Sequence, residues 1–158
     1  VMYENSRAWT YDIKDIGYRY HLSNLHAAIG IEQIKKLDVI RKTRQDICSY
    51  YYKSLKNSQF VTPPESNIQE VNPFLYYIKV KEPHRKNLRE HMSKQGIDTG
   101  IHWQAGHDFT FLKSCKRGNL EITERISKQI LSIPLHSKMS MKDAARVVEA
   151  ILSYKKDI

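Results

Sequence analysis

The sequence has few of the residues that build folds stabilised by disulfide bonds or by bound metal ions. It contains only two cysteines, five prolines and six glycines in 158 residues. Cys48 and Cys115 lie far apart and form no CxxC pair. This usage excludes a disulfide scaffold and a paired-cysteine zinc site, and it is typical of free thiols in a reducing compartment. We therefore expect a cytoplasmic protein.

Long apolar runs are also missing. No stretch approaches the roughly 20 apolar residues that a transmembrane helix needs. The first residues, "VMYENSRAWTYD", lack the basic region followed by an apolar region that marks a secretory signal. We expect no membrane partner. Because the chain begins with valine rather than methionine, we expect it to be a piece of a longer protein.

Familiar catalytic motifs are absent as well. The sequence has no GxSxG elbow, no GxxxxGKS loop and no GxGxxG turn. Five of its histidines and one cysteine could suggest a metal site, but no HExxH or closely spaced pair occurs among them, so surface or packing roles are favoured. These residues are His84, His91, His102, His107, Cys115 and His136. A self-contained active site is not visible.

Charge is plentiful and unbalanced. Lysine and arginine total 26 against 17 acidic residues, which gives a net charge of +9 and favours anionic partners. The basic residues are spread along the chain, and no RNA-binding signature accompanies them, so the pattern disfavours nucleic acid as a partner. The tyrosines at 50–52 are expected to pack in a core or interface rather than stack on bases.

A long amphipathic helix is predicted from Ser23 to Lys56, either continuous or as two helices in line, because apolar residues recur three or four apart there. A helix of this length is typical of a segment that bridges two domains or braces a subunit interface.

The remainder of the chain predicts short strands alternating with helices. The order is a loop at 57–73, then a strand at 74–81, a helix at 84–96 closed by Gly96, a strand at 97–103, a helix at 121–131, a strand at 132–136 and a helix at 141–156 capped by Ser140. Few strands and short connecting helices favour a small α+β domain with a mostly antiparallel sheet, preceded by the long helix.

Two stretches carry candidate binding residues. In "GYRYHLSNLHAAIG" (17–30), Arg19, His21 and the helix start at Ser23 could form an anion site. The alternative is an edge strand whose polar side chains face the solvent. In "GIHWQAGHD" (100–108), histidine, tryptophan and aspartate follow a strand, where they could hold a ligand or satisfy their own loop.

Three ordered motifs resemble one enzyme family. "GYRYHLSNLHAAIGIEQIKKLDVIRKTRQDICSYY", "KQGIDTGIHW" and "ERISKQILSIPLHSKMSMKDAARVVEAI" look like the C-terminal part of the DegT/DnrJ/EryC1/StrS sugar aminotransferases. The resemblance implies the small domain of a fold-type-I enzyme that uses pyridoxal phosphate. Such enzymes transfer an amino group from glutamate to a nucleotide-linked ketosugar, in amino-sugar or cell-surface polysaccharide synthesis, as homodimers.

The resemblance also implies residue roles. Arg19 stands at the family's asparagine and His21 at its basic residue, and with Ser23 these are implied to contact the cofactor phosphate of the partner subunit. His102 and Trp103 resemble the substrate-side end of a strand. The family's Schiff-base lysine belongs to a region upstream of these motifs, so no catalytic residue is assigned and the isolated chain is expected to be inactive.

The implied organisation is a domain-bridging and dimer-bracing segment at 1–56 followed by a small domain at 57–158. An alternative function is a non-catalytic module that docks on a full-length paralogue through the helix at 23–56. A third is a basic nucleic-acid-binding domain.

Overall fold

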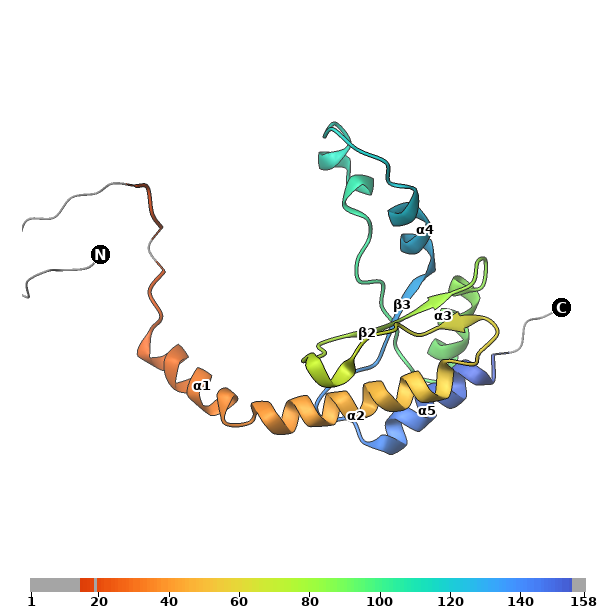
Figure 1. Cartoon of the computed structure of the whole chain (residues 1–158), viewed down its shortest axis with the longest axis horizontal. Coiled ribbons are helices and arrows are strands. Elements are labelled where there is room, and N and C mark those ends of the chain that lie inside the picture. Colours follow the sequence, from red (N-terminus) through yellow and green to blue (C-terminus); the bar gives the residue numbers. More distant parts are fainter. Residues whose placement is uncertain (1–14, 19, 155–158) are drawn as a thin grey trace, which may run out of the picture. The chain divides into compact units, whose positions relative to one another are not determined.

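The computed structural model describes residues 15–18 and 20–154, and it divides at Lys35 and Lys36 into two compact units (Figure 1). We call residues 15–35 the N-terminal unit, without residue 19, and residues 36–154 the C-terminal unit. Each is described by itself. The predicted functional division at residue 56 stays a prediction.

The N-terminal unit consists of an extended entry and helix α1 (Asn24–Ile34). Ser23 is the N-cap, and its side chain accepts a hydrogen bond from the backbone N–H of His26 at 3.3 Å. This satisfies one of the first-turn donors that a helix leaves unpaired. Helix α1 has no buried residue, and its apolar side chains are largely exposed: Leu25, Ile29, Ile31 and Ile34.

Helix α2 (Leu37–Leu55) opens the C-terminal unit, so the predicted long helix is two helices separated by Lys35 and Lys36. The two-helix alternative is therefore the correct one. Asp38 lies in the first turn of α2. A negative charge near a helix N-terminus interacts favourably with the helix dipole, so Asp38 stabilises a second helix that begins here.

Three short strands form an antiparallel sheet in the order β1-β2-β3. Strand β2 (Tyr76–Val80) is central and pairs with β1 (Val61–Thr62) and β3 (Ile130–Ile133). The mostly antiparallel α+β fold is confirmed. Strand β1 lies inside the segment predicted as a loop, where two residues are too few to give an alternating pattern.

Two predicted strands need correction. The segment 97–103 makes one bridge, Gly100 to Ser132, rather than a strand. Asp98 and Gly100 have low strand propensity, which limits the ladder to that pair. The strand predicted at 132–136 lies instead at Ile130–Ile133. It begins earlier because α4 (Glu121–Gln129) ends at Gln129, and it ends earlier because Pro134 has no N–H that could continue the sheet.

The remaining predicted helices are present as α3 (Arg85–Lys94), α4 and α5 (Met141–Leu152), with single 3-10 turns at Ile68–Glu70, Gly106–Asp108 and Thr110–Leu112. Gly96 ends α3 with a φ of 69°, the left-handed conformation predicted for it. Ser140 and Asp143 form a reciprocal capping box at α5. The hydrogen bonds from Ser140 hold the pKa of the Asp143 carboxyl below its usual value.

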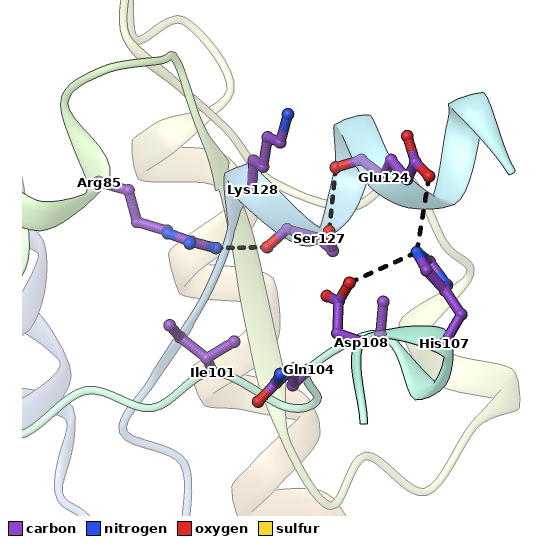
Figure 2. Close-up of a pocket in the computed structure, with 9 residues that line it drawn as sticks. Arg85, Ile101, Gln104, His107, Asp108, Glu124, Ser127 and Lys128 are labelled. Atoms are coloured by element: carbon purple, nitrogen blue, oxygen red, sulfur yellow. Dashed lines mark hydrogen bonds and ion pairs between the residues drawn. The ribbon is translucent and has the colours of Figure 1, made fainter. Parts of the chain in front are cut away.

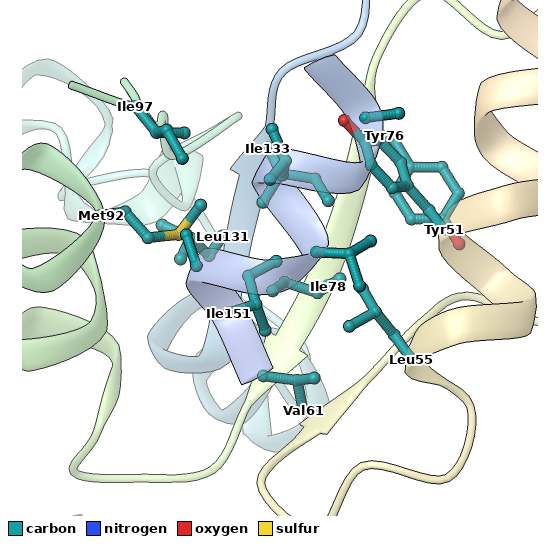
Figure 3. Close-up of a cluster of buried hydrophobic side chains, with 14 of the residues drawn as sticks. Tyr51, Leu55, Val61, Tyr76, Ile78, Met92, Ile97, Leu131, Ile133 and Ile151 are labelled. Atoms are coloured by element: carbon teal, nitrogen blue, oxygen red, sulfur yellow. The ribbon is translucent and has the colours of Figure 1, made fainter. Parts of the chain in front are cut away.

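The core lies between the sheet and helices α2, α3 and α5 (Figure 3). Alternate residues of β2, Tyr76, Ile78 and Val80, are buried, and they belong to one cluster with side chains from all three helices. Tyr51 is fully buried as predicted, and its hydroxyl donates to the carbonyl of Pro134 at 2.8 Å. Burial also raises the pKa of the Cys48 thiol to about 12, so this cysteine is an unreactive core residue.

Outside the core, the exposed cysteine is Cys115, and both cysteines are free. Among the residues that the structure describes, no helix is both long enough and apolar enough to cross a bilayer.

Neighbouring residues of α5 offer a matched test of this core. Ile151 is fully buried, whereas Leu152 is about half exposed. We expect Ile151→Ala to lower the free energy of unfolding by roughly 2–5 kcal/mol, because it removes buried methyl groups and leaves a cavity. Leu152→Ala should lower it by less than about 1 kcal/mol. Urea denaturation of both variants measures the difference, and equal losses would contradict this description of α5.

Candidate functional site

One hollow of about 520 Å³ opens where the sheet ends. Its wall is formed by residues just before β2, by the end of β3 and the residues that follow it, and by residues around the Gly100 bridge. The lining residues are Phe74, Leu75, Asp98, Thr99, Gly100, His102, Trp103, Ser132, Ile133, Pro134 and Leu135. We call it the sheet-end hollow. A hollow of this size falls in the range of small-molecule sites.

The sheet holds one wall of this hollow in place through a pair of backbone hydrogen bonds. The N–H of Gly100 donates to the carbonyl of Ser132 at 3.0 Å, and the N–H of Ser132 donates back at 2.8 Å. Ser132 itself pairs with Tyr77 of β2. The segment that carries His102 is thus attached to the edge of β3 by one residue.

Glycine at this attachment leaves room for the His102 ring, which lies directly over it. A Cβ built on Gly100 would overlap the imidazole, with Nδ1 only 3.0 Å away. His102 in turn meets the Trp103 ring edge-on, with centroids 5.5 Å apart and planes at 80°. The two residues predicted to bind substrate are therefore brought together in one hollow.

Sequence reasoning missed a third aromatic residue of the hollow. Phe74 lies 6.5 Å from the Trp103 ring, centroid to centroid, with an interplanar angle of 30°. It was expected inside the strand at 74–81, but β2 begins only at Tyr76. The preceding Pro73, which disfavours a central strand position, was the signal that could have placed Phe74 outside the sheet.

A second hollow, of about 540 Å³, lies between α4 and the segment 101–108 (Figure 2). Here the His107 imidazole stands between two carboxylates, with Nε2 3.7 Å from oxygens of both Asp108 and Glu124. The Arg85 guanidinium donates to the carbonyl oxygen of Ser127 near the end of α4.

The second hollow is crossed by its own polar contacts. The His107 ring faces the carboxylates of Asp108 and Glu124, and Arg85 donates to a backbone carbonyl, which fits the interpretation of a loop satisfied by internal interactions. The candidate residues of "GIHWQAGHD" are thereby divided: His102 and Trp103 line the sheet-end hollow, and His107 and Asp108 line the second.

The predicted anion site lies in the N-terminal unit. His21 and Ser23 are exposed, and Ser23 caps α1. The Oγ of Ser23 also lies 2.8 Å from Nδ1 of His26. The first turn of α1 contains no acidic residue, so nothing there repels an anion. Arg19 lies outside the described residues.

The described residues also offer no cluster for metal chemistry. No three histidine, cysteine, aspartate or glutamate side chains in this part of the chain are grouped so that they could hold a metal ion. The chemistry available in the sheet-end hollow is therefore aromatic contact and hydrogen bonding, supplied by the rings and by Asp98 and Thr99.

The position of His102 can be tested at Gly100. We expect Gly100→Ala to displace the imidazole, and with it the ring edge against Trp103, because the added methyl group occupies the same space. NMR resonances of the His102 Cε1–H and the Trp103 indole should both shift. Gly118→Ala is the control, since a Cβ there meets nothing within 4 Å. Unchanged His102 and Trp103 resonances in Gly100→Ala would contradict the contact.

Comparison with known proteins gives consistent matches over nearly the whole chain. A model of the DegT/DnrJ/EryC1/StrS aminotransferase family matches residues 2–152. A curated relative from Campylobacter jejuni, UDP-4-amino-4,6-dideoxy-N-acetyl-beta-L-altrosamine transaminase, is 32% identical over 152 residues, which are 93% of this chain and 40% of the relative. The chain thus spans about two fifths of the length of that relative.

Solved structures share the fold. AtS13 from Actinomadura melliaura superimposes with a TM-score of 0.83 at 22% identity, over 93% of this chain and 39% of that one. NtdA from Bacillus subtilis, solved with bound cofactor PMP, gives a TM-score of 0.77 at 23% identity, over 92% and 35% of the two chains. The family match and the shared fold lead to one conclusion: the chain belongs to the DegT/DnrJ/EryC1/StrS aminotransferase family and corresponds to its C-terminal portion.

Proposed function

We propose that this chain is the C-terminal portion of a pyridoxal phosphate-dependent enzyme that transfers an amino group from glutamate to a nucleotide-linked ketosugar. The observation that carries the proposal is the family match over residues 2–152. It is supported by the Campylobacter jejuni relative, which is named as a transaminase of a UDP-linked amino sugar. The complete enzyme would be a cytoplasmic homodimer that serves amino-sugar or cell-surface polysaccharide synthesis.

The N-terminal unit fits one part of the cofactor, its phosphate. Backbone N–H groups at the start of α1 and the exposed His21 offer hydrogen-bond donors without a competing carboxylate. We propose that Arg19, His21 and Ser23 contribute to holding this phosphate in the partner subunit. Pyridoxal phosphate supplies, when bound, the electron-withdrawing ring through which an amino group can be exchanged.

The C-terminal unit would supply the substrate side. His102 and Trp103 line a hollow held to the sheet by the Gly100 bridge, so their positions are set before a ligand arrives. We propose that they contact the nucleotide-linked sugar. The amino group leaves glutamate as 2-oxoglutarate forms and ends on the former ketone carbon of the sugar.

Exposed apolar side chains of the N-terminal unit are an argument for the proposed contact between subunits. Tyr18, Tyr20 and Leu22 in the entry are each more than 70% exposed, and the apolar residues of α1 are more than half exposed. Surfaces of this kind are typical of interaction sites. The same observation favours the second candidate function, a module that docks on a full-length paralogue.

The amino-transfer proposal can be tested with a chimera. The part of the Campylobacter jejuni transaminase that this chain does not cover is fused to the chain, and the product is checked for dimerisation and bound pyridoxal phosphate. With the UDP-linked amino sugar of that relative and 2-oxoglutarate, we expect glutamate to form in the reverse reaction.

Substitution of His21 in this chimera tests the proposed phosphate contact separately from the activity. His21→Ala should weaken retention of pyridoxal phosphate, because one phosphate contact is lost, whereas His136→Ala in the C-terminal unit should not. A dimeric, cofactor-loaded chimera that forms no glutamate would contradict the proposed activity.

A further inference from the structure

Two aromatic rings of the sheet-end hollow are open to solvent. Phe74 is 67% exposed and Trp103 is 65% exposed, although their planes lie within 30° of each other. Large aromatic side chains gain free energy when they are buried, so a pair left exposed beside a hollow is suited to receive another group.

Both rings are held by the backbone that carries them. Trp103 follows the Gly100 bridge and is braced by the edge of His102. Phe74 follows Pro73, whose carbonyl oxygen accepts a hydrogen bond from the Arg44 guanidinium of α2 at 3.3 Å. Because the backbone next to both rings is held in this way, little backbone entropy is lost when a flat ligand stacks on them.

The polar groups of the hollow narrow the class of ligand. The residues that line it include Asp98, Thr99 and His102, but no lysine or arginine. The hollow is therefore unsuited to a diphosphate, which would meet a carboxylate and no permanent cation. An uncharged planar ring with N–H and carbonyl groups on its edge fits better, because Asp98 can accept a hydrogen bond and Thr99 can donate one.

We propose that Phe74 and Trp103 form a stacking platform for the base of the nucleotide-linked sugar, with Asp98 and Thr99 at the edge of that base. This inference rests on the proposed function for the identity of the nucleotide, and it adds Phe74, Asp98 and Thr99 to the substrate site. Stacking on an aromatic face provides affinity for a base with little dependence on which base it is.

The platform can be tested on the chain itself with uridine 5′-monophosphate as the probe. Saturation-transfer NMR should label the uracil H5 and H6 protons more strongly than the ribose protons, and ribose 5-phosphate should give no comparable signal. We expect Phe74→Leu and Trp103→Leu each to raise the Kd by roughly fivefold to 150-fold, the range for loss of one stacking contact.

The matched control is Phe111→Leu. Phe111 is 91% exposed and does not line the hollow, so this variant should bind uridine 5′-monophosphate as the parent does. Because Phe74 and Trp103 are exposed, their substitution removes no core contact, and circular dichroism should confirm that the fold is retained. Absence of uracil saturation, or equal Kd values for Phe74→Leu and Phe111→Leu, would overturn the platform.

The chimera keeps this inference distinct from the proposed function. An active chimera whose KM for the nucleotide-linked sugar is unchanged by Phe74→Leu would overturn the platform and leave the aminotransferase proposal standing. A cofactor-loaded chimera without activity, together with uracil binding that depends on Phe74, would overturn the activity and support the base site.

Discussion

A single pair of backbone hydrogen bonds, between Gly100 and Ser132, determines where the candidate substrate residues lie. Ser132 belongs to β3, whose neighbours Leu131 and Ile133 are buried in the core, so the rigidity of the core extends to Gly100. Gly100 has no side chain, and this allows the His102 ring to lie over it and against Trp103. The position of the His102 ring in the sheet-end hollow therefore depends on one bridge and one missing Cβ.

This arrangement explains why the binding residues lie beside the strands rather than within them. A residue inside a paired strand has its backbone hydrogen bonds satisfied by the ladder, and its side chain faces either the core or the opposite face of the sheet. Phe74, before β2, and Trp103, beyond the bridge, are free of that constraint and still close to it. Positions just outside a rigid sheet combine exposure with fixed placement, which is the combination that binding requires.

The sequence predicted those features that depend on local chemistry. The Ser140 capping box, the left-handed Gly96 and the helical character of 23–56 follow from side chains a few residues apart, and the structure contains all of them, with the segment 23–56 as two helices. The bridge at Gly100 and the stacking of Phe74 on Trp103 depend on residues about 30 positions apart, so no local pattern encodes them. The strand predicted at 97–103 was wrong because apolar alternation does not reveal that Gly100 alone finds a partner.

Amide hydrogen exchange at Gly100 tests the central claim most directly. If the bridge positions the hollow, the Gly100 amide should exchange at a rate close to that of Ser132, and slower than the amide of Gly118 in the adjoining loop by roughly two orders of magnitude or more. An exchange rate for Gly100 equal to that of Gly118 would show that the segment is not held by the sheet, and it would contradict the account of how His102 and Trp103 are placed.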